Sequence, residues 1–329
     1  MSKVFVVGSN SFSGASFVEA LTQQGHEVTG YGRSPEPHPA FTPYKWTPRA
    51  GTFKFHQYDL NHDLEEMMDL IEHEKPTYVV NFAAQSMVAE SWKNPDHWFM
   101  TNVVSTVRFH DRLRHCEFIE KYVHVTTPEV YGSTSGSIDE NTPFNPSTPY
   151  AVSRAASDMS LKTFFAAYHF PVVFTRAANV FGSGQQLYRI IPRTILFIKL
   201  GRKLQLHGGG HSERSFIAID DVSDATMRIM QDGVPGETYH ISTTRIITIR
   251  NLVHMICERM KVTFEDHVEV VGERLGKDAA YTLNSDKLRS QLGWRDRVSL
   301  EQGIDETITW VEHWFSDLKQ LPSDYIHKP

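Results

Sequence analysis

Four side chains in the middle of the chain have the types and spacing of a proton-transfer site. Thr127 and Glu129 lie two residues apart, and Tyr150 precedes Arg154 by four residues, so on a helix the last two share one face. A fixed cation lowers the pKa of a neighbouring phenol, and Tyr150 can then accept a proton from a hydroxyl group while hydride leaves the same carbon. Thr127 can hydrogen-bond the oxygen that loses the proton. For Tyr150 alone, an amphipathic helix position is the simpler interpretation.

Glu129 points to chemistry beyond the oxidation of an alcohol. Once a sugar carbon has become a ketone, the proton on the next carbon is acidified, and a carboxylate can remove it and drive an elimination. Pro128, the residue before it, offers no proton. The acid for water loss must then be Glu129 itself after protonation, a water molecule, or Tyr150. A helix N-terminal charge or a surface carboxylate is the competing interpretation of Glu129.

The N-terminal stretch predicts the first elements that position these residues. Residues 3–7 form an apolar run ending at glycine, which indicates a buried parallel strand, and residues 15–24 have a helical pattern. Strand, glycine turn and helix is the context of a dinucleotide-binding loop, whose N–H groups face a pyrophosphate. Ser11 stands where a middle glycine is expected. The residues of this loop predicted to bind the cofactor are Gly8, Asn10, Ser11, Phe12 and Gly14.

Arg33 bears on which dinucleotide binds. It follows the predicted second strand, residues 27–31, and no carboxylate occurs between that strand and Glu36. An acidic residue at this place holds the 2′-hydroxyl of NAD, whereas an arginine accommodates the 2′-phosphate of NADP. The sequence therefore predicts NADP, with NAD as the alternative. A solvated side chain is the other interpretation of Arg33.

The predicted third strand, residues 53–58, ends at two further candidate cofactor residues, Asp59 and Leu60. A carboxylate at the end of this strand can accept a hydrogen bond from the adenine amino group. Capping the helix predicted over residues 64–74 is the competing role of Asp59.

Three more strands are predicted at residues 77–82, 122–126 and 172–175. The first ends in Ala83 and Ala84, whose small side chains let a nicotinamide lie close to the backbone. Because strands and helices alternate along this half of the chain, we predict a doubly wound parallel sheet. Ligands bind at the carboxyl ends of such strands, where the fifth strand leads directly into Thr127.

Composition excludes several function classes. The chain has 329 residues, 40% of them hydrophobic, which predicts one large α/β domain with a smaller partner. A net charge of −6 argues against a general nucleic-acid binder. The two cysteines, Cys116 and Cys257, are far apart and predict free thiols in a reduced compartment, and no Cys/His spacing predicts a metal. Without a signal peptide or a long apolar run, the sequence predicts a soluble, cytoplasmic protein.

Four motifs together resemble the extended short-chain dehydrogenase/reductases. They are Gly8-x-x-Ser11-x-x-Gly14, Asn81-Phe82-Ala83-Ala84, the heptapeptide Thr-Thr-Pro-Glu-Val-Tyr-Gly at 126–132, and Tyr150-x-x-x-Arg154. The likeness is greatest to the nucleotide-sugar 4,6-dehydratases that act on dTDP-glucose or GDP-mannose. It implies a Rossmann domain, an internally recycled NAD(P), and Tyr150 and Arg154 as cofactor contacts as well as catalytic residues.

Three positions depart from that family. The family has lysine where this chain has Arg154, which keeps the charge but changes its shape. The dTDP-glucose enzymes have aspartate and the GDP-mannose enzymes serine where this chain has Pro128. Met87 stands where relatives usually have histidine.

The resemblance also implies a set of substrate-binding residues. Asn179, Arg214 and Arg274 are expected to touch the diphosphate, because bidentate arginine suits phosphate, and His207 is expected to stack on the nucleotide base. Surface ion pairs are the alternative for Arg214 and Arg274. The full set is Gln85, Ser86, Asn179, Arg189, His207, Arg214 and Arg274.

These observations predict an NAD(P)-dependent nucleotide-sugar 4,6-dehydratase. A nucleotide-sugar epimerase or a nucleotide-uronate decarboxylase is the alternative, since neither needs the acid that Pro128 lacks. A protein that only binds dinucleotide and nucleotide sugar is the alternative of another class, motivated by Pro128 and Arg154. The cofactor domain is predicted over 1–178, with returns near 212–245, and the nucleotide-sugar domain over 179–329.

Two long helices are predicted at 95–116 and 150–169. By analogy with relatives of the same fold, they are expected to form a homodimer interface. Asn102 within the first helix is predicted to be a buried structural amide and not a catalytic residue.

Overall fold

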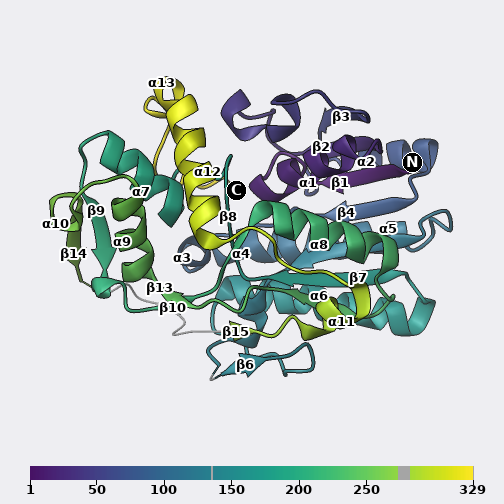
Figure 1. Ribbon diagram of the computed structural model, residues 1–329. Helices are drawn as coiled ribbons and strands as arrows, with labels where there is room; N and C mark the ends of the chain where they lie inside the picture. The colour runs from purple at the N-terminus through teal and green to yellow at the C-terminus, as the bar shows by residue number, and fades with distance from the viewer. Residues whose placement is uncertain (135, 273–281, 329) are drawn as a thin grey trace.

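The centre of the protein is a seven-stranded parallel sheet, as the sequence predicts (Figure 1). The computed structural model describes residues 1–134, 136–272 and 282–328. The strand order is β12-β7-β5-β4-β1-β2-β3. The strands are β1 (Lys3–Val7), β2 (Glu27–Gly32), β3 (Thr52–Gln57), β4 (Tyr78–Asn81), β5 (Lys121–Thr126), β7 (Val172–Ala177) and β12 (Thr238–Ile241).

The direction of strand addition reverses at β1. The chain adds β2 and then β3 on one side of β1, and returns to place β4 on the other side, with Val7 paired to both Tyr31 and Asn81. The loops that follow β1 and β4 therefore leave the same edge of the sheet in different directions. Such a switch point opens a crevice at the carboxyl ends of the strands, which is where a dinucleotide binds in this fold.

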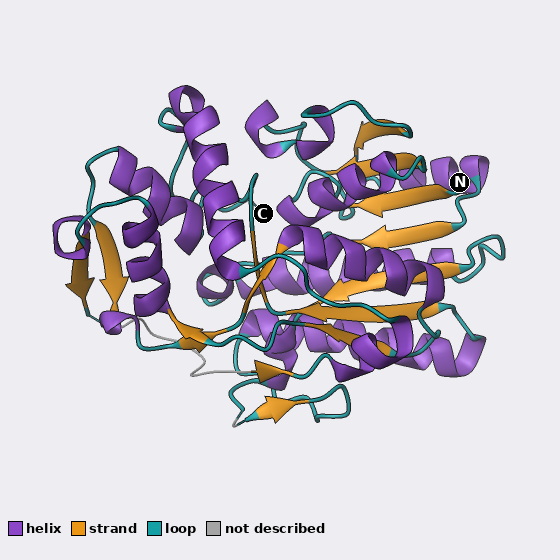
Figure 2. Cartoon of the chain, in the orientation of Figure 1, coloured by secondary structure: helices purple, strands orange, loops and turns teal. Residues whose placement is uncertain are grey.

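Helices cover both faces of the sheet (Figure 2). Val4 and Val6 of β1 face one layer, formed by α1 and α8, while Phe5 and Val7 face the other, formed by α2, α5 and α6. This alternation explains why the strand is apolar at every position, since both faces are buried. The helices are α1 (Phe12–Gln23), α2 (Leu64–Glu74), α5 (Thr106–Leu113), α6 (Pro149–Tyr168) and α8 (Ile219–Asp232).

The predicted helix over 95–116 is not regular. It consists of α4 (Pro95–Phe99), a π-helical turn η3 (Met100–Ser105) and α5, and it ends at Leu113. The wide turn holds Asn102, which is fully buried and hydrogen-bonded away from its own helix. Single π-helical turns of this kind occur frequently at functional sites.

A smaller lobe has its own hydrophobic core, in which Ile195, Leu206, Ile256 and Trp310 pack together. Figure 1 shows it beside the carboxyl edge of the sheet. Its elements are α7 (Ile190–Lys199), β9 (Leu204–His207), α9 (Ile249–Arg259), α10 (Phe264–His267), β14 (Val268–Val271), α12 (Leu300–His313) and α13 (Phe315–Leu318). The division at residue 178 stays a prediction.

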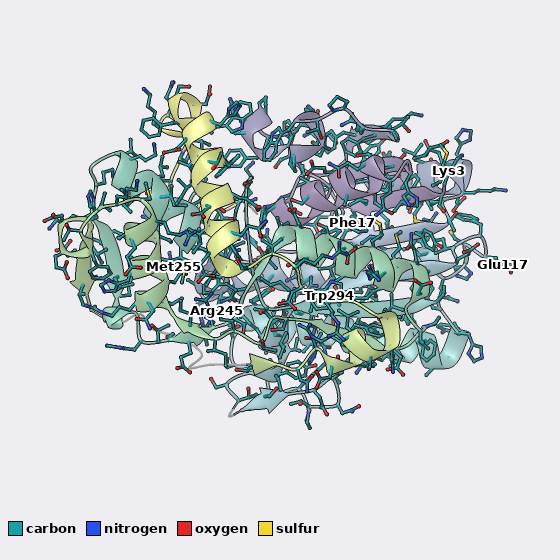
Figure 3. All side chains as sticks on the ribbon, viewed as in Figure 1. Lys3, Phe17, Glu117, Arg245, Met255 and Trp294 are labelled. Carbon is teal, nitrogen blue, oxygen red and sulfur yellow. The ribbon has the colours of Figure 1, made fainter. Side chains whose placement is uncertain are left out.

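Short elements connect the two parts of the molecule. They are α3 (Val88–Ser91), β6 (Ser137–Ile138), β8 (Asn179–Phe181), β10 (Glu213–Arg214), β11 (Phe216–Ala218), β13 (Ile247–Thr248), β15 (Thr282–Leu283) and α11 (Asp286–Leu292), with the 3-10 turns η1 (Pro39–Phe41), η2 (Pro43–Lys45), η4 (Pro128–Tyr131) and η5 (Gly208–Gly210). Trp294 after α11 is fully buried, and its Nε1 donates to Asp221 O at 3.1 Å (Figure 3). It fastens the returning chain to α8.

Cys116 and Cys257 are buried free thiols, which confirms that prediction. Within the described ranges, no helix combines the length and the apolar run that crossing a bilayer requires.

Candidate active site

A cavity of about 470 Å³ lies at the switch point of the sheet. It is formed by the ends of β1, β2, β3 and β4, so residues from four separate predicted motifs meet in one place. The predicted cofactor residues that line it are Gly8, Asn10, Ser11, Arg33, Asp59, Leu60, Ala83 and Ala84. Gln85, predicted to bind substrate, lines the same cavity.

The glycine loop has the backbone that a bound dinucleotide needs. Gly8 has φ +80°, and a Cβ there would lie 2.7 Å from Ala83 N. A Cβ at Gly14 would lie 2.2 Å from Gly8 O. Ser11 Oγ donates to Gly8 O at 2.7 Å and accepts from Gly14 N at 3.1 Å, so serine closes the loop and caps α1 in place of the expected glycine. The start of α1 thus fits a pyrophosphate.

Two predicted loop residues act through their packing. Asn10 Nδ2 donates to Ser34 O at 2.8 Å, and a Cβ at Gly32 would clash with Asn10 Oδ1 at 2.3 Å. This contact holds the end of β2 against the glycine loop. The ring of Phe12 is buried in the core, so this residue can meet a cofactor only through its backbone.

Asp59 does not cap the following helix. Asp63 is the N-cap residue of α2, and its Oδ2 accepts from Asp59 N at 2.7 Å. Asp59 Oδ1 accepts from Asn61 N at 2.8 Å, which forms a tight turn facing the cavity. Asp63 thus occupies the N-cap position of α2, although its side chain makes no capping hydrogen bond to the helix.

Asn102 connects the cofactor cavity to the helix that carries Tyr150. Its Oδ1 accepts from Gln85 N at 2.8 Å, while Nδ2 donates to Gln85 O and to Ser153 Oγ, both at 3.0 Å. The prediction of a buried structural amide is confirmed. The wide turn of η3 brings this amide to the backbone after β4, so the loop containing Ala83 and α6 are held in register.

The four predicted proton-transfer residues are brought together beyond β5. Thr127 Oγ1 accepts from Glu129 N at 3.2 Å and starts η4, of which Pro128 is the first residue. Thr148 caps α6 and sets the position of Tyr150. Thr127 lies within hydrogen-bonding reach of the Tyr150 phenol, and the charges of Glu129 and Arg154 both act on that phenol.

The chain's own groups together raise the pKa of Tyr150, although Arg154 lowers it as the sequence predicts. Burial raises the pKa most, Arg154 lowers it, Glu129 raises it, and the hydrogen bond with Thr127 lowers it. Desolvation of the charged phenolate outweighs the nearby cation. The spacing of the two residues does not reveal this burial, and the lowered pKa in the presence of a charged nicotinamide stays a prediction.

Arg154 is only 3% exposed and donates through Nη2 to Val125 O at the end of β5. One helical turn later, Asp158 is fully buried; its Oδ2 lies 2.8 Å from Arg176 Nη2 and accepts from Thr126 Oγ1 at 3.1 Å. Burial alone would raise the pKa of Asp158, but the bond with His124 and the charges of Arg176 and Arg154 hold it well below its usual value. The negative charge of Asp158 therefore balances the buried guanidinium of Arg176, with which it forms an ion pair.

Asp158, Arg176 and His124 were not singled out from the sequence. The available signal was the spacing of Arg154 and Asp158, which places both on one face of a helix. Their roles depend on β5 and β7 lying side by side beneath α6.

The predicted substrate residues are distributed over the smaller lobe and its connections. Arg189 precedes α7, and its charge acts on the Tyr150 phenol. Asn179 begins β8 and Arg214 lies on β10. His207 ends β9, with Nδ1 3.1 Å from Gly272 O.

Ser86 is exposed and, like Asn179, His207 and Arg214, lies outside the lining of the 470 Å³ cavity. Tyr150, Arg154, Phe12 and Gly14 are not part of that lining either. Arg274 lies outside the described residues. The roles assigned to these side chains stay predictions.

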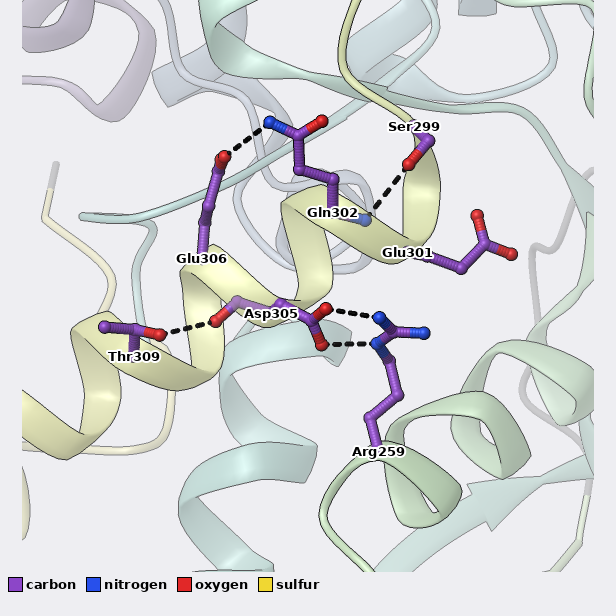
Figure 4. A pocket seen from close by; sticks show the side chains of 7 residues that line it. All are labelled: Arg259, Ser299, Glu301, Gln302, Asp305, Glu306 and Thr309. Carbon is purple, nitrogen blue, oxygen red and sulfur yellow. Dashed lines mark hydrogen bonds and ion pairs between the residues drawn. The ribbon is translucent and has the colours of Figure 1, made fainter.

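A second hollow, of about 500 Å³, lies along α12 and contains none of the predicted site residues (Figure 4). Arg259 forms a double ion pair with Asp305, and Gln302 Nε2 donates to Glu306 Oε1 at 2.9 Å. These side chains of the hollow bond to one another, and none of the predicted cofactor residues lines it. Across residues 1–134, 136–272 and 282–328, no group of three or more acidic, histidine or cysteine side chains is placed to hold a metal.

Comparison with known proteins agrees with this geometry. A model of the GDP-mannose 4,6-dehydratase family matches residues 5–307. Human dTDP-D-glucose 4,6-dehydratase is 34% identical over 275 residues, which cover 82% of this chain and 78% of the relative.

Two solved dTDP-glucose 4,6-dehydratases have the same fold. The Streptomyces venezuelae enzyme, with NAD bound, has a TM-score of 0.86 at 28% identity, covering 94% of this chain and 97% of its own. The Bacillus anthracis enzyme, in complex with NAD, has a TM-score of 0.87 at 27% identity, covering 97% and 99%. The predicted family is confirmed: the chain belongs to the GDP-mannose 4,6-dehydratase family, among the nucleotide-sugar 4,6-dehydratases of the extended short-chain dehydrogenase/reductases.

Proposed function

We propose that this protein is an NAD(P)-dependent 4,6-dehydratase of a nucleotide-diphosphate hexose. The observation that carries the proposal is the meeting of Tyr150, Thr127 and Glu129 beyond the end of β5. The relatives named above, which are dTDP-glucose 4,6-dehydratases, support it. Bound NAD(P), held by the glycine loop and by Ala83 and Ala84, supplies the hydride acceptor and donor.

Tyr150 accepts the proton from O4 of the hexose. Thr127 shares a hydrogen bond with the phenol and orients that oxygen. Arg154 acts on the phenol from one turn along α6 and lowers the free energy of the phenolate. Asp158 forms its ion pair with Arg176 and adds a negative charge one turn along α6 from Arg154, and we assign it as a positioning residue.

Glu129 removes the C5 proton once C4 is a ketone. The hydroxyl of C6 then leaves as water and needs a proton. Pro128 supplies none, so the protonated Glu129 gives the leaving hydroxyl the proton that it took from C5. Hydride then returns to C6 from the reduced dinucleotide, C5 takes up a proton from solvent, and Tyr150 releases the O4 proton to solvent, which leaves a 4-keto-6-deoxy sugar.

The Glu129→Gln variant tests this role. We expect it to lose deuterium exchange at C5 of the bound sugar, measured by NMR, while it still binds dinucleotide, because an amide cannot accept the proton. Glu117→Gln, an exposed carboxylate elsewhere on the surface, serves as the matched control and should exchange normally. Exchange retained in Glu129→Gln would remove the assignment.

NADP is the dinucleotide that the chain supports best, with NAD as the alternative. Arg33 lines the cavity at the end of β2. Glu36, the first carboxylate after β2, is bound by Lys45 at 2.9 Å and by the Tyr44 hydroxyl at 2.7 Å. Glu36 also lines the cavity, but its negative charge is already paired with Lys45, which leaves Arg33 to favour a 2′-phosphate.

A C4 or C5 epimerase, or a nucleotide-uronate decarboxylase, is the second candidate. The observation that favours it is Pro128, which is buried at the first position of η4 and provides no acid for water loss. Neither of these reactions requires an acid at C6.

The substrate and the assembly are proposed as follows. Arg189 and Arg214 bind the diphosphate, Asn179 touches it, and His207 stacks on the base. A homodimer is supported by exposed apolar side chains on η3 and α6, namely Met100 (47%), Val104 (37%), Val152 (39%) and Met159 (59%). The homodimer and the cytoplasmic location stay predictions.

A further inference from the structure

The segment 323–328, here called the strap, leaves α13 in the smaller lobe and ends at the cofactor cavity. On the lobe side, Arg193 Nη2 donates to Asp324 Oδ1 at 2.9 Å, and Arg193 Nη1 donates to Ser323 O at 3.3 Å. The Tyr325 ring meets the Tyr188 ring edge-on at 5.3 Å. Figure 1 shows the end of the chain between the lobe and the sheet.

On the sheet side, His327 fixes the direction of the strap. Its ring is stacked on His97 and on Trp98, in both cases with centroids 5.1 Å apart, and its Nε2 lies 2.8 Å from His97 Nδ1. Trp98 is fully buried and so provides a rigid platform. Along the strap, half-buried and exposed residues alternate, which is the pattern of an extended segment with one face inward.

Lys328 follows His327 on the exposed face of the strap and lines the same cavity as the cofactor residues. Its carbonyl accepts from Arg33 Nη2 at 3.0 Å and from Gln85 Nε2 at 2.8 Å. Its ammonium donates to Ser34 Oγ at 3.1 Å. Two cations and a hydroxyl therefore meet at the carboxyl end of β2, where this fold discriminates the 2′-substituent of the adenosine ribose.

This arrangement suits a phosphate monoester and not a hydroxyl. A ribose 2′-hydroxyl needs an acceptor, whereas a 2′-phosphate is an anion that needs donors and positive charge. Glu36, the first carboxylate after β2, also lines the cavity, but its charge is paired with Lys45 and its other oxygen accepts from the Tyr44 hydroxyl.

We propose that Lys328 is a cofactor-specificity residue, which joins Arg33 and Ser34 in binding the 2′-phosphate of NADP. The proposal rests on the proposed NAD(P)-dependent function and adds to it a specificity determinant that lies 295 residues from Arg33 along the chain. The strap carries this residue from the smaller lobe, so dinucleotide preference depends on contacts of both parts of the molecule.

The test compares the affinities of the full chain for NADP⁺ and NAD⁺ by isothermal titration calorimetry. With Arg33 still present, Lys328→Ala should weaken NADP⁺ binding by about ten-fold and leave NAD⁺ binding within about two-fold. Lys328→Arg should retain the preference. Lys319→Ala, which removes an exposed lysine before the strap, is the matched control and should change neither affinity.

Each other outcome contradicts the proposal in a recognisable way. Equal weakening of both dinucleotides, or no change, shows that Lys328 does not read the 2′-position. Tighter binding of both by Lys328→Ala shows that the strap competes with the cofactor. If the unaltered protein binds neither dinucleotide, the proposed function fails as well, whereas binding without discrimination overturns only the role of Lys328.

Discussion

At the scale of single residues, burial and charge act in opposite directions on the pKa of the Tyr150 phenol. Burial raises its pKa, while Arg154 and the hydrogen bond with Thr127 lower it. A base with a raised pKa accepts a proton only in the fraction of molecules where it is ionised. We therefore expect the charge of Arg154 to affect the reaction rate, in addition to any effect on the position of α6.

We predict that Arg154→Gln raises the pKa of Tyr150 further. Below that pKa, each unit of increase reduces the ionised fraction about ten-fold, so kcat/KM near neutral pH should fall roughly ten-fold to a hundred-fold. The rising limb of the pH–rate profile should move to higher pH. Arg154→Lys keeps the charge and should leave the limb nearly in place. If Arg154→Gln lowers the rate without moving the limb, the cation acts only on structure.

At the scale of elements, β12 depends on contacts that the sequence does not display. His240 on this strand accepts at Nε2 from the Tyr131 hydroxyl, 2.7 Å away, and donates from Nδ1 to Asn284 O at 3.2 Å. The bond at Nε2 requires a neutral ring, because a protonated nitrogen cannot accept, whereas the Nδ1 bond is compatible with either protonation state. Burial and the charge of Arg176 lower the pKa of His240 to about 3.

This pKa predicts a loss of stability in mild acid. The unfolded chain protonates His240 below its ordinary pKa of 6.5, and the folded protein only below about 3. Between these values the unfolded state binds one proton more, so the free energy of unfolding falls as the pH falls, by at most about 1.4 kcal/mol per pH unit from this group. Urea denaturation of the protein and of His240→Gln between pH 7 and pH 4 measures the difference.

The variant should show a shallower decline of stability with falling pH, because glutamine does not titrate. Other buried histidines, such as His124, contribute to the slope in both proteins and cancel in the comparison. Parallel curves for the two proteins would mean that His240 takes up its proton alike in the folded and unfolded states.

The strands of the cofactor half were predictable from β-branched and aromatic residues between turn residues, which form a continuous apolar run in β1 and are interrupted by polar residues in β3. β12, with Thr238 and His240 among its four residues, lacks a continuous apolar run, and it is buried through its pairing with β7 and through the core packing of Tyr239 and Ile241. The interruption of the helix around Asn102 was not predictable either, since its cause is a partner 17 residues away on another element.

The types of residue in the candidate site were predictable from the sequence, whereas the pKa shifts of its side chains were not. The glycine loop, Arg33, Ala83 and the meeting of Thr127 with Tyr150 follow from motif and spacing. The raised pKa of Tyr150 and the buried partner Asp158 depend on desolvation, which is a property of the packed molecule.

At the scale of the whole molecule, the two ends of the described chain meet in one cavity, which Gly8 and Lys328 both line. Contacts this distant in sequence cannot be read from local patterns. Arg193 of the smaller lobe and Trp98 of α4 both contact the strap, so the strap joins the parts of the molecule that bind sugar and dinucleotide in our proposal.

The mass of the product is the measurement that tests dehydration most directly. The purified protein is incubated in deuterated water with NAD(P) and a panel of nucleotide hexoses, and the products are analysed by mass spectrometry. We predict a product lighter by one water, apart from the deuterium it gains, from at least one hexose. A product of unchanged mass with deuterium at C5 would contradict dehydration and indicate an epimerase, and release of carbon dioxide from a uronate would indicate a decarboxylase.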